Sequence, residues 1–338
     1  MTEAQLKPVL HHFPSLPKTE GLAGMYAGVS KGILFCMGGA NFTDKKPWEG
    51  GKKKWYDEIY MLAEGKEWIK LKQKMPAALA YGVSVTYKDQ FITIGGNDDQ
   101  HHTAEVKAYT WNGYSLSIID YPELPVTLAN MAGTVVGNLI ILVGGNSTPV
   151  SPAMNKCFAL DLDNLQGGWF EMDSIPGRER LLPTCASYNH QFYLFSGETV
   201  SVNEQNEKKR LILKDAYKMQ PKKINGKWIA NWETLSPMPR GGSAAGNPLP
   251  VLQNGTMVFW GGVDSITALH KDPATHPGIS GEMFLYSPID DTWKFVGVEE
   301  KVKARVTLPV VKWNNQWLYI SGEIRPAVRT NAIDGINY

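Results

Sequence analysis

Six apolar, strand-like segments that end in Gly-Gly or Ser-Gly recur along this chain of 338 residues. They are "ILFCMGG", "QFITIGG", "LIILVGG", "QFYLFSG", "TMVFWGG" and "QWLYISG", and their final glycines are Gly39, Gly96, Gly145, Gly197, Gly262 and Gly322. A strand with an aromatic residue follows most of them, and then a tryptophan strand that ends in a proline turn, as in "ANWETLSPMPR". A period near 50 with four short strands per unit is typical of the kelch type of β-propeller. The sequence therefore predicts an all-β, six-bladed kelch-type β-propeller.

The last blade lacks an outer strand in this pattern, because "TNAIDGINY" supplies a third strand but no fourth. The N-terminal segment "LKPVLHHFPSLP" ends in the same Leu-Pro turn that closes other outer strands. We expect this segment to close the ring by joining the C-terminal blade, with residues 6–12 pairing with 329–336. Blade six would then consist of about residues 1–17 with 305–338, and no sheet edge would be left open. The repeat runs through the chain without a linker, which predicts a single domain over residues 1–338.

Charge and composition narrow the classes of function. The formal net charge of +1 gives no electrostatic reason to expect nucleic acid or an anionic membrane as a partner. No apolar run approaches the roughly 18 residues that span a bilayer, and the N-terminal residues show no signal-peptide pattern. Either the protein is cytoplasmic, or a signal has been removed. Cys36, Cys157 and Cys185 lie in separate apolar segments and are predicted to be buried free thiols.

The arginines are distributed differently from the lysines. With the strands of a blade named A to D from the axis outward, the B–C loops and the D–A connections emerge on one face. All seven arginines fall in these loops, whereas the 27 lysines occupy both faces. They are Arg178, Arg180, Arg210, Arg240, Arg305, Arg325 and Arg329. Because guanidinium matches a carboxylate in two parallel hydrogen bonds, this sorting suggests an anion-binding mouth. The alternative is that some of them, Arg178 and Arg210 first, brace loops.

One stretch, "ISGEIRPAVRTNAI", places a carboxylate and a guanidinium at this mouth. Glu323 follows the glycine of the last repeat, and Arg329 lies six residues on. The stretch resembles the bacterial N-acetylneuraminate mutarotases (sialic acid epimerases), which are six-bladed kelch propellers with a Gly-Glu followed six residues later by Arg. "AYGVS" at residues 80–84 is also similar to a strand start of that family. The motif lies mid-chain in the best-known members and in the last blade here, as in a cyclically permuted branch.

The resemblance implies an isomerase of carbohydrate metabolism that interconverts the α and β anomers of N-acetylneuraminate without metal or cofactor. Glu323 corresponds to the proton acceptor of the family and Arg329 to its paired arginine, and Arg180 matches an arginine at an equivalent blade start. The best-known members are periplasmic, whereas no signal is visible here, so the compartment stays open. The oligomeric state stays open as well, a homodimer included.

The chemistry suits these two side chains. Exchange of anomers requires ring opening, rotation and reclosure, and therefore a base for the anomeric hydroxyl and an anchor for the sugar carboxylate. Glu323 could move the proton, while Arg329 could hold the carboxylate and keep Glu323 ionised. The alternative is a structural ion pair that braces the loop.

Other residues at the mouth are candidate substrate contacts: Arg180, Arg325, Arg240, Arg305, Glu198, Asn97 and Tyr81. In "NDDQHH", residues 97–102, adjacent histidines would point to opposite sides, so hydrogen bonds to a polyol are favoured over a shared metal. The basic loop "DKKPWEGGKKKW", residues 44–55, could be a lid whose Trp48 or Trp55 stacks on the sugar, or a solvated loop.

Two other functions fit the same fold: a non-enzymatic kelch scaffold for a partner protein, and a sugar-binding propeller without catalysis. The scaffold would need exposed aromatics and no buried carboxylate–guanidinium pair. A copper oxidase would need convergent metal ligands, which the scattered cysteines do not favour.

Overall fold

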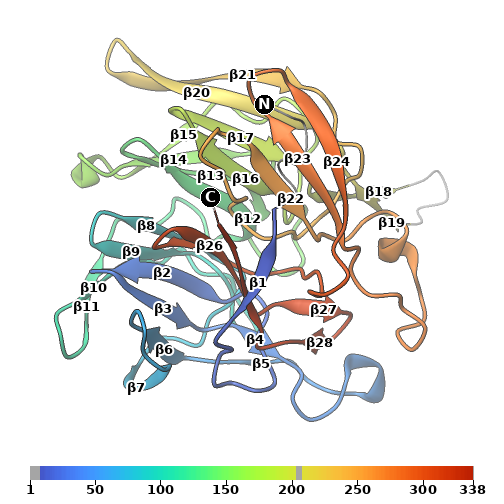
Figure 1. Ribbon diagram of the computed structural model, residues 1–338. Helices are drawn as coiled ribbons and strands as arrows, with labels where there is room; N and C mark the ends of the chain where they lie inside the picture. The colour runs from blue at the N-terminus through green and yellow to red at the C-terminus, as the bar shows by residue number, and fades with distance from the viewer. Residues whose placement is uncertain (1–7, 203–207, 338) are drawn as a thin grey trace.

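The structure, a computed structural model, describes residues 8–202 and 208–337. Six β-sheets surround a central axis as the blades of a propeller (Figure 1). Helix in these residues is limited to three short 3-10 turns, η1 (Pro47–Glu49), η2 (Leu165–Gly167) and η3 (Thr267–Leu269). In the described part of the chain, no helix has the length and apolar character that crossing a membrane requires. The six-bladed, all-β architecture predicted from the sequence is confirmed.

The strands of each blade pair antiparallel, and the inner strands of successive blades pack side by side. Blade one contains β2 (Tyr26–Ser30), β3 (Ile33–Met37), β6 (Glu58–Leu62) and β7 (Ile69–Lys74). Blade two contains β8 (Val83–Tyr87), β9 (Gln90–Ile94), β10 (Val106–Trp111) and β11 (Leu116–Asp120). Blade three contains β12 (Ala129–Val136), β13 (Leu139–Asn146), β14 (Cys157–Asp161) and β15 (Trp169–Met172).

The remaining blades follow the same plan. Blade four contains β16 (Thr184–Tyr188), β17 (Gln191–Phe195), β20 (Ala216–Ile224) and β21 (Lys227–Leu235). Blade five contains β22 (Met257–Trp260), β23 (Glu282–Ser287) and β24 (Thr292–Val298), and a single bridge from Val251 to Met257 marks its inner edge. Blade six contains β25 (Val310–Trp313), β26 (Gln316–Ile320), β29 (Ile333–Asn337) and β1 (Leu10–Phe13).

Three B–C loops carry small additional hairpins on the same face. They are β4 (Ala40–Asn41) with β5 (Lys54–Trp55), β18 (Glu198–Val202) with β19 (Lys208–Ile212), and β27 (Glu323–Arg325) with β28 (Val328–Arg329).

The ring is closed by the N-terminal strand. β1 pairs antiparallel with β29, from Leu10 opposite Ile336 to Phe13 opposite Ile333 (Figure 1). The Nδ1 atom of His12 lies 2.7 Å from Oδ1 of Asp334 in the same blade. The predicted closure is confirmed, within a register of 10–13 with 333–336; residues 1–7 of the predicted segment lie outside the described residues.

A closed ring of backbone hydrogen bonds surrounds the axis. One residue at the start of each blade donates its N–H to the carbonyl of its counterpart in the preceding blade, at 2.7 to 2.9 Å. This inner ring consists of Gly24, Tyr81, Asn130, Leu182, Ala244 and Thr307. All six have φ between 51° and 65°, a conformation that residues other than glycine rarely adopt. The ring also lines a small axial cavity of about 70 Å³.

The recurring glycine pairs join each blade to the next. The second glycine of three Gly-Gly pairs, and Gly322 of the Ser-Gly pair in blade six, donate their N–H to a carbonyl at the start of the following blade. The blades approach so closely there that a Cβ atom on Gly96 would lie 1.9 Å from the hydroxyl of Tyr26. In blades four and six, Ser196 and Ser321 replace the first glycine, and each hydroxyl accepts an N–H of the next blade at 2.8 Å. The Gly-Gly and Ser-Gly motifs from which the fold was predicted are therefore the places where successive blades are joined.

The hydrophobic core lies between neighbouring blades, and it contains the cysteines. Cys36, Cys157 and Cys185 are free and wholly buried, as predicted. Burial raises the pKa of each thiol, so all three remain protonated and unreactive at neutral pH.

Candidate active site

Glu323 and Arg329 face each other across the hairpin formed by β27 and β28. They are paired in the antiparallel register, which places both side chains on one face of the hairpin. Nη2 of Arg329 lies 2.7 Å from Oε2 of Glu323. The backbone of Glu323 is also held by two hydrogen bonds of 2.9 Å with Val306, in the connection that leads into blade six. The predicted carboxylate–guanidinium pair is thus present and rigidly mounted.

The environment of Glu323 disfavours its charged form. Burial raises the pKa of the carboxyl, and the positive charges of Arg329 and Lys53 offset only part of this rise. The result is a pKa above the ordinary value of glutamate. The Glu323 side chain is nevertheless 21% exposed, so it can exchange a proton with a molecule at the mouth. In an ordinary ion pair, the neighbouring cation lowers the pKa of the carboxyl group. Here the pKa of Glu323 is raised, because the effect of burial exceeds that of Arg329.

Arg329 is enclosed. Its side chain is 3% exposed, and its Cζ lies 5.1 Å from the centre of the Phe42 ring. Its Nε and Nη1 atoms are buried and have no hydrogen-bond partner among the described residues. Phe42 follows β4, so blade one covers the guanidinium of blade six.

An aromatic cluster surrounds a lysine next to this pair. Nζ of Lys53 lies 4.7 Å from the ring centre of Tyr81, 5.5 Å from that of Trp55 and 5.6 Å from that of Phe42. The indole of Trp55 donates to Oδ1 of Asn97 at 3.0 Å. The structure therefore brings the predicted Tyr81 and Asn97 together with Trp55, on the side of the mouth next to Glu323.

The basic loop predicted as a lid contacts blade six. Nζ of Lys46 donates to the carbonyl of Ala327, in the turn between β27 and β28, at 2.8 Å. Trp48 is exposed, whereas Trp55 is partly buried in the cluster. The sequence singled out the two tryptophans of this loop, but not Lys53, Lys46 or Phe42. The three consecutive lysines at 52–54 were the available signal, and only the fold shows which of them faces the site.

Two other predicted substrate contacts, Arg180 and Arg305, are buried and bind carboxylates of the same chain. Arg180 is wholly buried and binds both carboxylate oxygens of Asp215 at 2.8 Å. Arg305 is 2% exposed, and its Nη2 lies 2.5 Å from Oδ2 of Asp334. Both guanidinium groups fasten connections between blades, and we leave both out of the candidate site.

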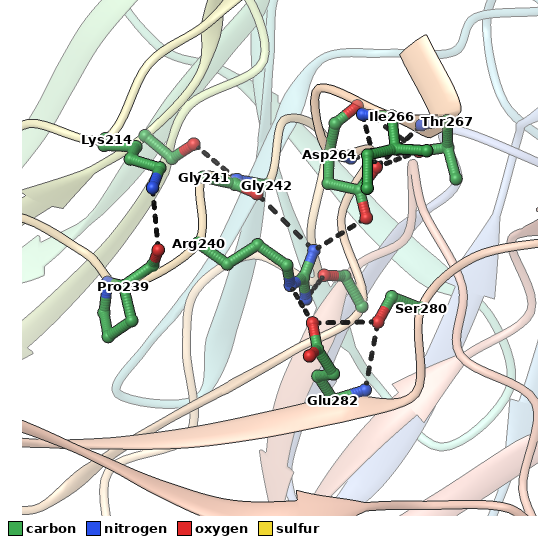
Figure 2. A network of polar contacts seen from close by, with 12 residues as sticks. Lys214, Pro239, Arg240, Gly241, Gly242, Asp264, Ile266, Thr267, Ser280 and Glu282 are labelled. Atoms are coloured by element: carbon green, nitrogen blue, oxygen red, sulfur yellow. Dashed lines mark hydrogen bonds and ion pairs between the residues drawn. The ribbon is translucent and has the colours of Figure 1, made fainter. Parts of the chain in front are cut away.

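Arg240 is held in a network of its own between blades four and five (Figure 2). It donates to the carbonyl of Gly261 at 2.9 Å, and its Nε lies 2.9 Å from Oε2 of Glu282. Asp264 lies within 3.8 Å, and burial lowers the pKa of the guanidinium. These contacts give Arg240 a bracing role as well.

Glu198 and Arg325 make contacts of their own. Glu198 contacts Nη2 of Arg210 and accepts a hydrogen bond of 2.5 Å from the hydroxyl of Ser243. It begins the hairpin of blade four as Glu323 begins that of blade six, but its cross-strand partner is Ile212, not the arginine. Arg325 is exposed and lines a separate cavity together with His276.

The segment "NDDQHH" divides as its alternation predicts. His101 is exposed, whereas His102 is buried and its Nδ1 lies 3.0 Å from the carbonyl of Asn146. Of this segment, only Asn97 takes part in the aromatic cluster, and no group of three potential metal ligands occurs among the described residues.

Most of the arginines make the contacts expected of the alternative, in which they brace loops. Five of the seven guanidinium groups lie within 4.0 Å of a carboxylate of the same chain, those of Arg180, Arg210, Arg240, Arg305 and Arg329. Loops that cross between blades expose carbonyls and acids that a planar guanidinium can join, which a lysine does less well.

The fold and this pair place the protein in the class of six-bladed β-propellers, with a partly buried carboxylate–guanidinium pair on the face of the B–C loops. The family model "N-acetylneuraminate epimerase" matches residues 5–118 and 121–268, and the chain belongs to this family. Residues 269–338, and with them Glu323 and Arg329, lie outside the matched segments.

Curated relatives match over shorter stretches. An N-acetylneuraminate epimerase of Salmonella enteritidis PT4 is 43% identical over 94 residues, which is 25% of this chain and 24% of the relative. That of Yersinia enterocolitica serotype O:8 is 38% identical over 111 residues, 29% of this chain and 27% of the relative. The chain thus spans about a quarter of the length of the curated relatives it matches. The solved structure titled "Structure of YjhT" aligns over 95% of both chains with a TM-score of 0.67 at 14% identity, a likeness of fold alone.

Proposed function

We propose that this protein is an isomerase that interconverts the α and β anomers of N-acetylneuraminate. Membership in the N-acetylneuraminate epimerase family supports the substrate class. The geometry of Glu323 and Arg329 supports the reaction type, because anomer exchange needs one group that accepts a proton and returns it.

The reaction can be written with residues of this chain. Glu323 removes the proton of the anomeric hydroxyl while the ring C–O bond breaks and the ring oxygen takes up a proton from a water molecule. The open keto form then rotates about a C–C bond. In the reverse steps, the chain hydroxyl gives its proton back to that water and adds to the other face of the carbonyl, and Glu323 returns its proton to the new anomeric oxygen. Arg329 stabilises the charged form of Glu323 through their 2.7 Å contact.

One observation carries this proposal: the partly exposed Glu323 carboxylate lies 2.7 Å from the buried guanidinium of Arg329. Burial raises the pKa of this carboxyl although the arginine adjoins it. A carboxyl whose pKa lies nearer to neutrality exchanges protons at both stages of the cycle more readily. Tyr81 and Asn97 are the proposed contacts for the sugar hydroxyls, because both belong to the partly exposed cluster beside the pair.

The first prediction concerns the base. Glu323→Gln keeps the size of the side chain but removes the proton acceptor, so we expect the catalysed rate to fall by a factor on the order of 10² to 10⁴. The measurement is proton NMR of sialic acid anomers after sialidase release, near neutral pH, as the excess over the rate in buffer.

The matched control is Glu64→Gln, the same change at an exposed turn on the opposite face, which should leave the excess rate unchanged. An unaltered rate in a folded Glu323→Gln protein would place the base elsewhere, with Glu198 next to test. Absence of any excess rate in the native protein would favour a non-enzymatic propeller.

A further inference from the structure

Three cations lie near Glu323: Arg329, Lys53 and Lys46. They differ in exposure and in the contacts that they already make. Arg329 directs Nη2 at Glu323, while its Nε and Nη1 atoms are shielded from solvent under Phe42. A sugar carboxylate could reach these donors only if the residues that cover them moved. The burial that suits Arg329 to tune Glu323 makes it a poor anchor for a ligand.

Lys53 has the opposite character. Its side chain is partly exposed, and no hydrogen bond or ion pair of its ammonium group occurs among the described residues. The three aromatic rings of the cluster hold the ammonium by cation–π contacts. Such contacts fix the position of a charge but satisfy none of its three N–H donors.

The neighbouring lysines do not share this position. Lys52 and Lys54 are exposed. Lys46 uses its ammonium on the carbonyl of Ala327. Lys53 therefore combines accessibility with a fixed place in this loop.

Lys53 is also tied to the reacting pair. The ring of Phe42 contacts the guanidinium of Arg329 on one side and the ammonium of Lys53 on another. The charge of Lys53 is close enough to lower the pKa of Glu323, against the effect of burial.

We propose that Lys53, held by Phe42, Trp55 and Tyr81, binds the carboxylate of the acidic sugar, and that Arg329 is a positioning residue for Glu323. This inference rests on the proposed function and names the group that selects an acidic substrate. It replaces the expectation that Arg329 clamps the carboxylate.

The test separates binding from catalysis. In a Glu323→Gln background, the affinity for N-acetylneuraminate is measured by isothermal titration calorimetry with and without Lys53→Met. Methionine retains an unbranched apolar stem between the rings and loses the charge. We expect a loss of affinity of roughly ten- to hundredfold, as for a hydrogen bond to a charged group. Lys53→Arg should restore most of it, and Lys52→Met, with the same charge change at an exposed site, should have little effect.

A second measurement uses the enzyme with Glu323 intact and a neutral substrate. Lys53→Met should raise the half-saturating concentration for the acid but not for its methyl ester, with the turnover number little changed. Equal effects on acid and ester, or unchanged affinity for the acid, would overturn the assignment. If the native protein binds the sugar through Lys53 but shows no excess rate over buffer, the proposed catalysis fails while the carboxylate site stands.

Discussion

At the scale of single residues, the central observation concerns the carboxyl group of Glu323. Nearby positive charges favour its ionised form, but their effect is smaller than that of burial. Burial raises the pKa of Glu323, and Arg329 and Lys53 lower it in part. The folded state therefore binds the Glu323 proton more tightly than the unfolded chain does. Stability from this group is complete below the unfolded pKa and is lost as the pH rises through the higher, folded pKa.

A stability measurement follows from that sign. Glu323→Gln imitates the protonated carboxyl at every pH. Its melting temperature relative to the native protein should therefore increase as the pH is raised from about 4, near the unfolded glutamate pKa, toward neutrality. Differential scanning calorimetry across this range checks the trend. A difference that is constant with pH, or that decreases, would show that Glu323 is an ordinary ion-pair partner.

The pH dependence of the catalysed rate should also report the ionisation of Glu323. Because Glu323 must be ionised to accept the anomeric proton, the catalysed rate should fall at acid pH. Replacing Arg329 by Gln removes a charge that lowers the pKa of Glu323, so the acid limb of the profile should move to higher pH. The excess NMR rate between about pH 5 and 8 measures this shift, with Arg178→Gln, an exposed arginine, as the control. An acid limb that stays in place would mean that Arg329 does not tune the base.

At the scale of elements, the arginines on the connections between blades act as internal braces. Arg305 and Asp334 are each 1% exposed in their side chains and lie 2.5 Å apart. Arg305→Met would remove the guanidinium partner of the buried Asp334 carboxylate and leave it only the contact with the exposed His12. Breaking a buried ion pair in this way typically destabilises a protein by about 3 to 5 kcal/mol. We expect a clearly lower midpoint of urea unfolding, and little change for the exposed Arg178→Met.

That experiment also tests Arg305 as a substrate contact. A ligand-binding arginine would alter the half-saturating sugar concentration and leave the unfolding midpoint nearly intact. If Arg305→Met fails to fold, Arg305→Lys should give a measurable intermediate loss, because it keeps the charge but not the planar fork.

From the sequence, the strands and blades could be predicted more completely than the side-chain contacts between different blades and loops. Glycine pairs, turns and tryptophan strands repeat locally, so the blades and even the role of β1 could be predicted. The Glu323–Arg329 pair could also be predicted, since its members lie only six positions apart in one hairpin. Lys53 could not, because its partners Phe42, Trp55 and Tyr81 come from two blades. The contact of Arg180 with Asp215 could not be predicted either, because 35 residues separate them in the sequence.

At the scale of the whole molecule, closure by β1 decides whether the ring has an edge. β29 pairs with β26 on one side and β1 on the other, so removal of β1 would expose its backbone groups. Deleting residues 1–14 should lower the melting temperature and cause association that increases with concentration, measured by light scattering. Deleting residues 1–7 alone keeps β1 and is the control. A monomeric, equally stable product of the longer deletion would contradict this role.

The inner ring has a further consequence for the chemistry at the mouth. The backbone of Tyr81 belongs to the inner ring of hydrogen bonds, and its aromatic side chain belongs to the cluster around Lys53. Its backbone position is fixed by bonds to Gly24 and Asn130, and through them by every other blade. The floor of the site is thus preorganised: its conformational entropy is lost when the protein folds, before any sugar arrives. A ligand has only to order the side chains and the loop above that floor.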